Sequence, residues 1–246
     1  MKNQLLITID GPAAAGKSTI SKALSKRISY ACLDTGALYR AIAYKVSEEG
    51  ISSDNEQLLS ELCKNVGISL KKIGRDMKVF VDEEDVTQKI RTEEIGLLAS
   101  KISAVPVVRR ALLSIQRKAG DEGGIIAEGR DMGTVVFPHA DIKFFLDADM
   151  PERAKRRYLE LLENESNADF DEVRISLVKR DQQDTARNIS PLKPSDDAII
   201  IDTTSLGIEE VVEKIESYIL NINGFAKSQI VPSPGGRGQR GGGVIS

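Results

Sequence analysis

The stretch Leu5-Leu-Ile-Thr-Ile-Asp10-Gly11-Pro-Ala-Ala-Ala-Gly16-Lys17-Ser18 decides the fold of this chain. Its first six residues are almost wholly apolar and end at a Gly-Pro pair, which is typical of a buried strand in a parallel sheet. The next eight fit the spacing G-x-x-x-x-G-K-[ST] of a phosphate-binding loop between a strand and a helix. Backbone N–H groups and the helix N-terminus attract an anion there, Lys17 adds a full charge, and Ser18 can hold Mg²⁺. The stretch predicts a bound nucleoside triphosphate without defining a reaction.

Further short apolar runs follow along the chain, with helical patterns between most of them. Short buried runs that alternate with helices predict an α/β fold with a mainly parallel sheet. The last helix shows the clearest amphipathic pattern, with acidic residues mostly opposite its apolar face. The runs cover residues 31–33, 124–127, 142–146 and 198–201, and the apolar face consists of Ile208, Val211, Val212, Ile215 and Ile219.

Three segments depart from this alternation. Between residues 66 and 86, apolar and polar residues alternate around Gly74-Arg75-Asp76, which predicts antiparallel strands joined by a turn. Two arginine-rich helices separated by the polar residues 163–168 predict a lid. From Phe225 on, Pro, Gly and three basic residues without an acid predict a flexible tail. We expect one domain over residues 1–222, with an insert at about 63–92 and a lid at about 153–187, and a tail over 223–246.

Composition excludes several classes of protein. The chain has 246 residues, of which 41% are hydrophobic and 29% charged, as in ordinary globular proteins. Two cysteines and the single His139 are too few for a disulfide framework or a multi-histidine metal site. Without a membrane-length apolar run or a signal-peptide pattern, we expect a cytoplasmic protein that binds no membrane. The net charge is −3, and no aromatic residue is interleaved with the arginines of the tail at residues 236–243, so we also expect no nucleic-acid partner.

Polar and basic side chains follow two further predicted strands. Asp34-Thr-Gly-Ala-Leu-Tyr39-Arg40 comes after residues 31–33, and Gly129-Arg130-Asp131-Met-Gly133 comes after residues 124–127. Ligands of open α/β sheets bind at the carboxyl ends of the strands, so these segments should face the phosphate loop. The lid supplies a third basic group, for which surface ion pairs are the alternative role: Arg153, Arg156, Arg157, Arg180 and Arg187.

An acceptor that is itself an anion fits this set of residues. An alcohol would need a carboxylate to take its proton, whereas a phosphate monoester loses its second proton near pH ~6 and needs no base. With one histidine and many placed arginines, we expect positioning and charge neutralisation to supply the catalysis.

Four motifs together closely resemble the bacterial cytidylate kinase family. They are the phosphate loop, the segments 34–40 and 129–138, and Arg180-Asp-Gln-Gln-Asp184 with Arg187, and the match runs from about Leu5 to Leu220. The resemblance implies a nucleoside monophosphate kinase-like P-loop fold with a small antiparallel insert. It also implies transfer of the γ-phosphoryl group of Mg·ATP to CMP or dCMP, giving ADP and CDP or dCDP, in pyrimidine nucleotide metabolism.

The same resemblance implies roles for single residues, so all of them are expectations of that likeness. Ser18 is the expected metal ligand, and the expected catalytic residues are Lys17, Arg40, Arg130 and Arg187. ATP is expected to contact Gly11, Pro12, Ala13, Ala14, Ala15, Gly16, Lys17, Ser18, Thr19 and Arg157. The acceptor nucleotide is expected to contact Asp34, Thr35, Tyr39, Arg40, Ser100, Arg109, Arg130, Asp131, Arg180, Asp184 and Arg187.

Within the acceptor set, the resemblance assigns the phosphate to Arg40, Arg130 and Arg187. Ser100, Arg109 and Asp131 would read cytosine, Tyr39 would lie beside the base, and Arg180 with Asp184 would reach the sugar. Arg110 stands next to Arg109, which leaves the choice between these two arginines open.

We expect the protein to be a monomer. Three alternatives to the cytidylate kinase interpretation remain at this point. A hydroxyl kinase similar to shikimate kinase would use Asp34 as its base, although Gly129-Arg-Asp-Met-Gly133 favours the nucleotide acceptor. A GTP-binding switch would carry a guanine-reading Asn-Lys-x-Asp motif, which the sequence lacks. An RNA-associated module would act through the basic tail.

Overall fold

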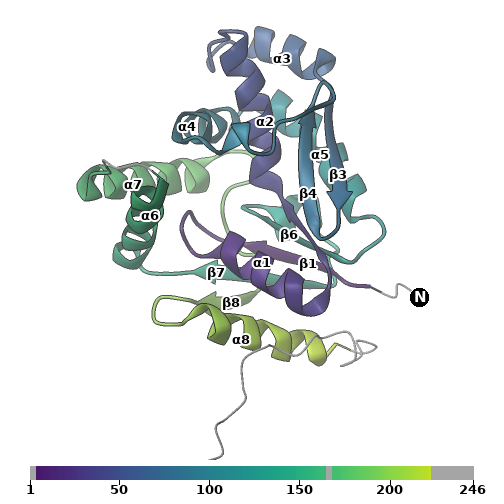
Figure 1. The fold of residues 1–246 in the computed structure, drawn as a ribbon, viewed down its shortest axis with the longest axis vertical. Helices are drawn as coiled ribbons and strands as arrows, with labels where there is room; N and C mark the ends of the chain where they lie inside the picture. Colours follow the sequence, from purple (N-terminus) through teal and green to yellow (C-terminus); the bar gives the residue numbers. More distant parts are fainter. Residues whose placement is uncertain (1–3, 165–167, 223–246) are drawn as a thin grey trace, which may run out of the picture.

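A parallel sheet forms the centre of the molecule. The computed structural model describes residues 4–164 and 168–222, and within them the strands form one sheet in the order β3-β4-β2-β6-β1-β7-β8 (Figure 1). Its central part, from β2 to β8, is parallel throughout. The parallel α/β sheet predicted from the sequence is therefore confirmed. These strands are β1 (Leu6–Asp10), β2 (Ala31–Asp34), β6 (Ile125–Gly129), β7 (Ile142–Asp147) and β8 (Ile199–Asp202).

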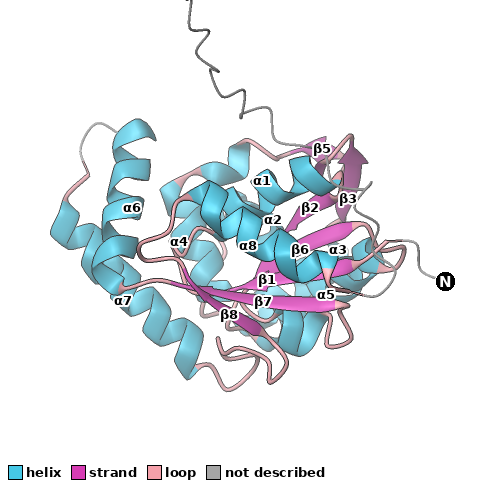
Figure 2. Ribbon diagram, turned by 90° about the horizontal axis from the view of Figure 1, so that it is seen from below, coloured by secondary structure: helices cyan, strands magenta, loops and turns pink. Residues whose placement is uncertain are grey.

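Helices cover both faces of this sheet because side chains alternate along each strand. Ile7 and Ile9 of β1 pack under α1 (Lys17–Ile28) and α8 (Ile208–Leu220), which lie together on one side of the sheet (Figure 2). Leu6 points to the opposite face, where η2 (Met132–Val136) and α5 (Pro106–Gly120) lie. The apolar face predicted for α8 is buried except at Ile208, the first helical residue, which is 50% exposed.

The predicted antiparallel insert is confirmed, but it is not a separate sheet. β3 (Ile68–Ile73), β4 (Asp76–Val81) and β5 (Glu84–Asp85) pair antiparallel, and β4 also joins β2 in parallel through Cys32 and Asp76. The main sheet therefore continues into the insert. A second core lies under α2 (Thr35–Glu48), α3 (Glu56–Asn65), η1 (Lys89–Arg91) and α4 (Glu93–Ile102), and it includes Leu38, Ile42, Leu59, Ile90 and Ile102.

Two helices, α6 (Met150–Asn164) and α7 (Phe170–Ala186), project from the sheet edge beside the phosphate loop (Figure 1). Ala154, Val173 and Leu177 pack against Ala13 of that loop. Two arginines of the predicted lid, Arg153 and Arg156, do not line the cavity and instead hold the lid helices in place. Arg153 donates to the carbonyl of Ala13 and pairs with Asp181 across α6 and α7. Arg156 anchors α6 by donating to Thr203.

The domain limits stay a prediction, and the tail over 223–246 lies outside the described residues. In the part of the chain that is described, no helix is long and apolar enough to cross a membrane.

Candidate active site

The phosphate loop lies between β1 and α1, and two glycines give it its shape. Gly11 has a φ of 148°, and a Cβ there would lie 2.0 Å from the carbonyl oxygen of Leu146. Gly16 has a φ of 91°, a left-handed conformation that turns the chain into α1. Both positions therefore need glycine. The N-terminus of α1 opens toward the loop, which favours an anion.

Lys17 is the central cation of the loop. Its side chain is 7% exposed, and Nζ donates to the carbonyl oxygen of Pro12 at 2.6 Å. Burial lowers the pKa of Lys17 well below its usual value, and the guanidinium of Arg130 lowers it further. A phosphate beside Nζ would favour the charged form, so this lysine fits an anionic ligand.

Glu128 meets the phosphate loop from β6 and was missed by the sequence analysis. Its Oε2 accepts a hydrogen bond from Oγ of Ser18 at 2.8 Å, and Oε1 has no partner among the described residues. Burial raises the pKa of Glu128 to about 7, and the nearby carboxylate of Asp34 adds to the shift. A hydroxyl and a carboxylate are hard oxygen ligands, so Ser18 and Glu128 fit Mg²⁺. The sequence feature that could have identified Glu128 is its position as an acidic residue directly after the apolar run 124–127.

One cavity of about 700 Å³ collects most of the predicted site. Gly11, Pro12, Ala15 and Gly16 are not part of its lining and shape the loop from behind. The predicted residues that do line it are Ala13, Ala14, Lys17, Ser18, Thr19, Asp34, Thr35, Tyr39, Arg40, Ser100, Arg109, Arg130, Asp131, Arg157, Arg180, Asp184 and Arg187.

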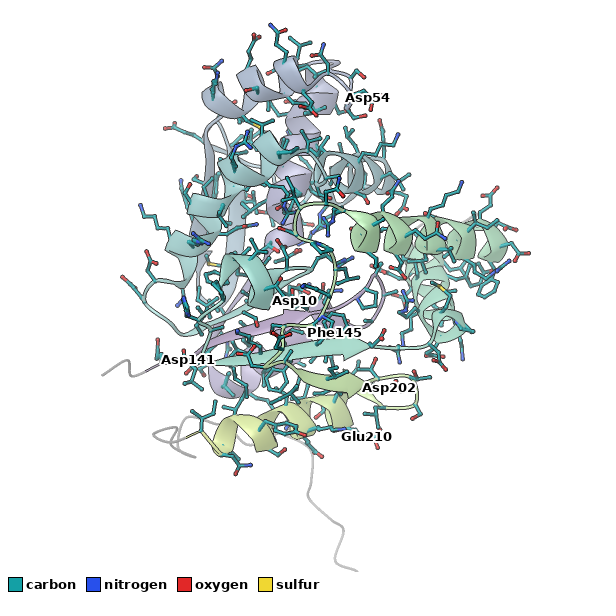
Figure 3. All side chains as sticks on the ribbon, turned by 180° about the vertical axis from the view of Figure 1, so that it is seen from behind. Asp10, Asp54, Asp141, Phe145, Asp202 and Glu210 are labelled. Carbon is teal, nitrogen blue, oxygen red and sulfur yellow. The ribbon has the colours of Figure 1, made fainter. Side chains whose placement is uncertain are left out.

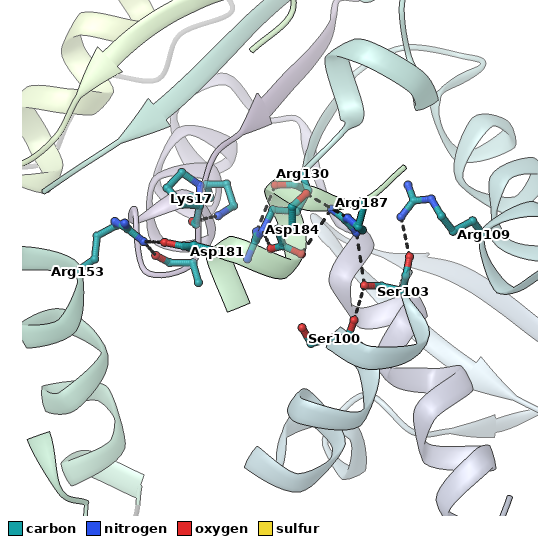
Figure 4. A network of polar contacts seen from close by, with 12 residues as sticks. Lys17, Ser100, Ser103, Arg109, Arg130, Arg153, Asp181, Asp184 and Arg187 are labelled. Atoms are coloured by element: carbon teal, nitrogen blue, oxygen red, sulfur yellow. Dashed lines mark hydrogen bonds and ion pairs between the residues drawn. The ribbon is translucent and has the colours of Figure 1, made fainter. Parts of the chain in front are cut away.

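The three arginines expected to bind the acceptor phosphate each have a carboxylate neighbour. Arg40 pairs with Asp34 at 2.7 Å, and Arg130 donates from Nε to Asp184 at 2.8 Å. Arg187 lies 3.4 Å from the other oxygen of Asp184 (Figure 4). Charge-assisted pairs of this kind orient the guanidinium groups in the cavity, and an incoming phosphate would compete for them.

The residues expected to read the base form a second group. Arg109 and Asp131 make a buried ion pair, and Arg109 also donates to the carbonyl of Ser103 at 3.0 Å. The guanidinium carbon of Arg109 lies 5.6 Å from the centre of the Tyr39 ring. Arg110 is exposed and not part of the cavity lining, so the geometry favours Arg109.

Ser100 and Thr35 differ in how their hydroxyl groups are used. Ser100 Oγ is buried and has no hydrogen-bond partner within the described ranges, so it is free to bind a ligand. Thr35 Oγ1 donates to the backbone carbonyl of Glu128 at 2.7 Å. Thr35 therefore ties the start of α2 to the end of β6 at the cavity wall.

Arg180 is a half-buried cation of the cavity. Burial lowers its pKa to about 10, and Arg130 adds repulsion, while its Nε lacks a partner among residues 4–164 and 168–222. The carboxylate expected to share the sugar with it, Asp184, is engaged by Arg130 and Arg187. Arg157 on α6 pairs with Glu93 of α4 and thereby links the lid to α4, which also lines the cavity.

Asp34 is poorly suited to act as a general base. Its carboxylate accepts from the backbone N–H of Ala37 at the start of α2 and pairs with Arg40 and Arg91. Burial by itself would raise the pKa of Asp34, but the two arginines hold it below its usual value. A strongly held carboxylate takes up a proton only weakly near neutral pH, which counts against the hydroxyl-kinase alternative.

A phosphate loop that faces a second cluster of arginines across one cavity defines a P-loop phosphotransferase. The family model described as cytidylate kinase matches residues 7–221. Relatives named cytidylate kinase come from Citrifermentans bemidjiense, 50% identical over 89% of this chain and 94% of the relative, and from Geobacillus sp. (strain WCH70), 46% identical over 89% and 98%. The chain therefore belongs to the cytidylate kinase family.

A solved shikimate kinase from Acinetobacter baumannii aligns over 89% of this chain and 94% of its own, with 12% identity and a TM-score of 0.45. That likeness is too slight to bear on the function.

Proposed function

We propose that the cavity binds Mg·ATP on the phosphate loop and CMP or dCMP among the arginines opposite, and that the γ-phosphoryl group passes between them. Membership of the cytidylate kinase family makes the chain a kinase that acts on CMP. The observation that carries the proposed roles is that Lys17 lines the same cavity as Arg40, Arg130 and Arg187. These fixed cations offset the repulsion between two phosphate anions brought head to head.

In the proposed reaction, an oxygen of the CMP phosphate forms a bond to the γ-phosphorus, and the bond from that phosphorus to the bridging oxygen of ADP breaks. The attacking oxygen is ionised near neutral pH, so no residue needs to remove a proton. Arg40, Arg130 and Arg187 would hold the acceptor phosphate in line, while Lys17 would follow the transferred group. Ser18 and Glu128 would hold Mg²⁺, whose charge offsets that of the phosphates.

Specificity for cytosine would come from Asp131, Arg109 and Ser100. A carboxylate accepts the exocyclic amino protons of cytosine, while the arginine and the hydroxyl donate to ring acceptors. Uracil would face Asp131 with a carbonyl, which costs on the order of 1–3 kcal/mol in a buried site. Arg180 and Asp184 are proposed to reach the sugar, and contact at its 3′ hydroxyl would allow both CMP and dCMP.

The test is an ADP-release assay with Mg·ATP and a panel of acceptors. CMP and dCMP should be turned over at least about tenfold faster than UMP, AMP or shikimate, because uracil presents a carbonyl to Asp131, adenine is a larger purine and shikimate carries no base. Equal rates with all acceptors would remove the base-specific assignment. A rate that does not depend on Mg²⁺ would remove the role of Ser18 and Glu128.

We also propose that residues 1–222 carry the whole activity, as a monomer in the cytoplasm where nucleotides are made and used. In support of these limits, the cytidylate kinase family model matches residues 7–221 and does not extend into the tail. Removal of residues 223–246 should leave kcat unchanged, and sedimentation should give the mass of one chain. Lost turnover or a stable dimer would contradict these two points.

A further inference from the structure

Asp10 is a buried carboxylate to which the roles proposed above assign nothing. It is the last residue of β1 and only 4% exposed. Alternation along the strand places its side chain on the face of Leu6, against η2, and opposite to Ile7 and Ile9. Figure 3 labels Asp10 within the fold, at the end of β1 where the phosphate loop begins.

Both oxygens of Asp10 accept backbone hydrogen bonds from the start of η2. Oδ1 accepts from the N–H of Met132 at 2.9 Å, and Oδ2 accepts from the N–H of Gly133 at 2.8 Å. Gly133 allows this approach, since a Cβ there would lie 3.2 Å from Oγ1 of Thr8 and 3.1 Å from Cδ of Lys143. Asp10 therefore holds the turn firmly against the sheet.

The first N–H groups of a helical turn have no partner inside the turn and need a cap. That cap is commonly the side chain of the residue just before the turn. Here this residue is Asp131, and its side chain makes no capping bond to η2. The carboxylate of Asp131 is instead paired with Arg109 at the cavity. Asp10 thus supplies, from another strand, the cap that Asp131 would normally supply.

We propose that Asp10 is a positioning residue for acceptor recognition: by capping η2 from β1, it frees the Asp131 carboxylate to read the base. Asp10 pairs in register with Gly129, and the phosphate loop begins at the next residue, Gly11. The same carboxylate therefore sets the position of Arg130 and Asp131 relative to the loop that holds ATP. This inference rests on the proposed roles of Arg130 and Asp131.

The test uses Asp10→Asn, because an amide has one oxygen and leaves either Met132 or Gly133 without its acceptor. Asp131 is then expected to turn toward η2. The ratio of kcat/KM for CMP over UMP should fall about tenfold, since a small misplacement of a reading group is costly. The KM for ATP should stay within about twofold, because Lys17 and Ser18 are untouched.

Asp141→Asn is the matched control. Asp141 accepts from the backbone N–H of Leu6 at 2.6 Å, at the opposite end of the same strand, and it does not line the cavity. The amide oxygen of the new side chain can still accept from Leu6, so this variant removes a carboxylate charge beside β1 without freeing a backbone N–H group, and it should keep the CMP/UMP ratio of the wild type. A fall of the ratio in both variants would overturn the inference, because the loss of a carboxylate charge beside β1 would then explain it.

Asp10→Ser, which has a shorter side chain with a single oxygen in place of the two that Met132 and Gly133 use, covers the case in which Asp10→Asn does not fold. An unchanged CMP/UMP ratio in a folded variant overturns the inference, whatever happens to kcat. If neither Asp10 variant folds while Asp141→Asn does, the inference is also overturned, because Asp10 is then a requirement of the fold.

The wild-type enzyme separates this inference from the proposed function. If the wild type does not prefer CMP over UMP, both the proposed role of Asp131 and this inference are contradicted. If the wild type prefers CMP and the Asp10 variants keep that preference, only this inference is contradicted.

Discussion

The two halves of the cavity are built in different ways. Apart from Arg157 of α6, the ATP half comes from one contiguous stretch, residues 11–19, whose backbone and glycines shape the loop. The acceptor half collects side chains from separate elements: Arg40 from α2, Ser100 from α4, Arg109 from α5, Asp184 from α7, and Asp131 from the loop between β6 and η2. Figure 4 shows Lys17 of the first half near Arg130 and Arg187 of the second.

Because of this difference, substitutions in the two halves should have different effects on activity. The phosphate loop depends on local conformation, and its main cation, Lys17, bonds to a carbonyl of the loop itself. The acceptor half depends on ion pairs between elements, such as Arg130 with Asp184 and Arg109 with Asp131. A change in the first half should affect all acceptors equally, whereas a change in the second should alter the choice among acceptors.

The largest effect is expected from Lys17→Ala. Removal of the cation that follows the transferred group should lower kcat about a thousandfold for CMP and dCMP alike, as when a preorganised donor is removed from an active site. The CMP/UMP ratio should not change, because the reading group is intact. Turnover by the ADP-release assay and a thermal unfolding curve check both points. Near-normal turnover in the folded variant would show that the role of Lys17 is misassigned.

Arg109→Ala, with Arg110→Ala as its matched control, tests the acceptor half. Loss of Arg109 removes a donor to the base and leaves Asp131 buried without its cation, so kcat/KM for CMP should fall about a hundredfold. The exposed Arg110 should tolerate replacement with less than about a twofold change. Steady-state kinetics of the two variants measures these changes. A larger loss of kcat/KM in Arg110→Ala than in Arg109→Ala would assign base recognition to Arg110 instead.

A pH effect on stability is expected from Glu128, which lies between the two halves. Its pKa is about 7 in the fold and about 4.5 in the unfolded chain, so the folded state binds more protons between these values. The free energy of unfolding of the wild type therefore falls as pH rises from about 4.5 to 7. The Glu128→Gln variant has no carboxyl group to titrate at this position, so it does not show this decrease. The unfolding free energy of the variant minus that of the wild type should rise on the order of 2 kcal/mol from pH 5 to pH 8.

Urea unfolding at the two pH values measures this difference for Glu128→Gln. Glu213→Gln, at an exposed position of α8, serves as the control and should follow the wild-type curve. A difference that is the same at pH 5 and pH 8 would show that Glu128 does not titrate in this range.

The smallest effect is expected from Glu93→Gln. Glu93 of α4 pairs with Arg157 of α6, and Arg157 is proposed to contact ATP, so ATP and Glu93 compete for the same guanidinium. The variant should lower the KM for ATP about two- to fivefold, the size of a partly exposed ion pair. Initial rates at varied ATP and saturating CMP measure it. An unchanged or higher KM would mean that Arg157 only links the lid to α4.

The elements with strong local signals were predicted best. The apolar run before Gly11 and the alternation around Gly74 correspond to β1 and to the β3–β4 pair, because period and turn residues are local properties. The pairing of β4 with β2 was missed, since one parallel contact between Cys32 and Asp76 leaves no pattern in the sequence. Ile208 was assigned to the buried face of α8 because periodicity alone does not show where packing stops.

Sequence alone determined that this protein has a phosphate loop, a parallel sheet, and arginines at the carboxyl ends of its strands, since those features are written in contiguous residues. Tertiary structure alone decided that Arg109 rather than Arg110 enters the cavity, that Glu128 meets Ser18, and that Asp10 caps η2. The physical reason is distance along the chain: Glu128 lies 110 residues from Ser18 and Met132 lies 122 residues from Asp10. Such contacts form only when the sheet brings separate strand ends to one edge.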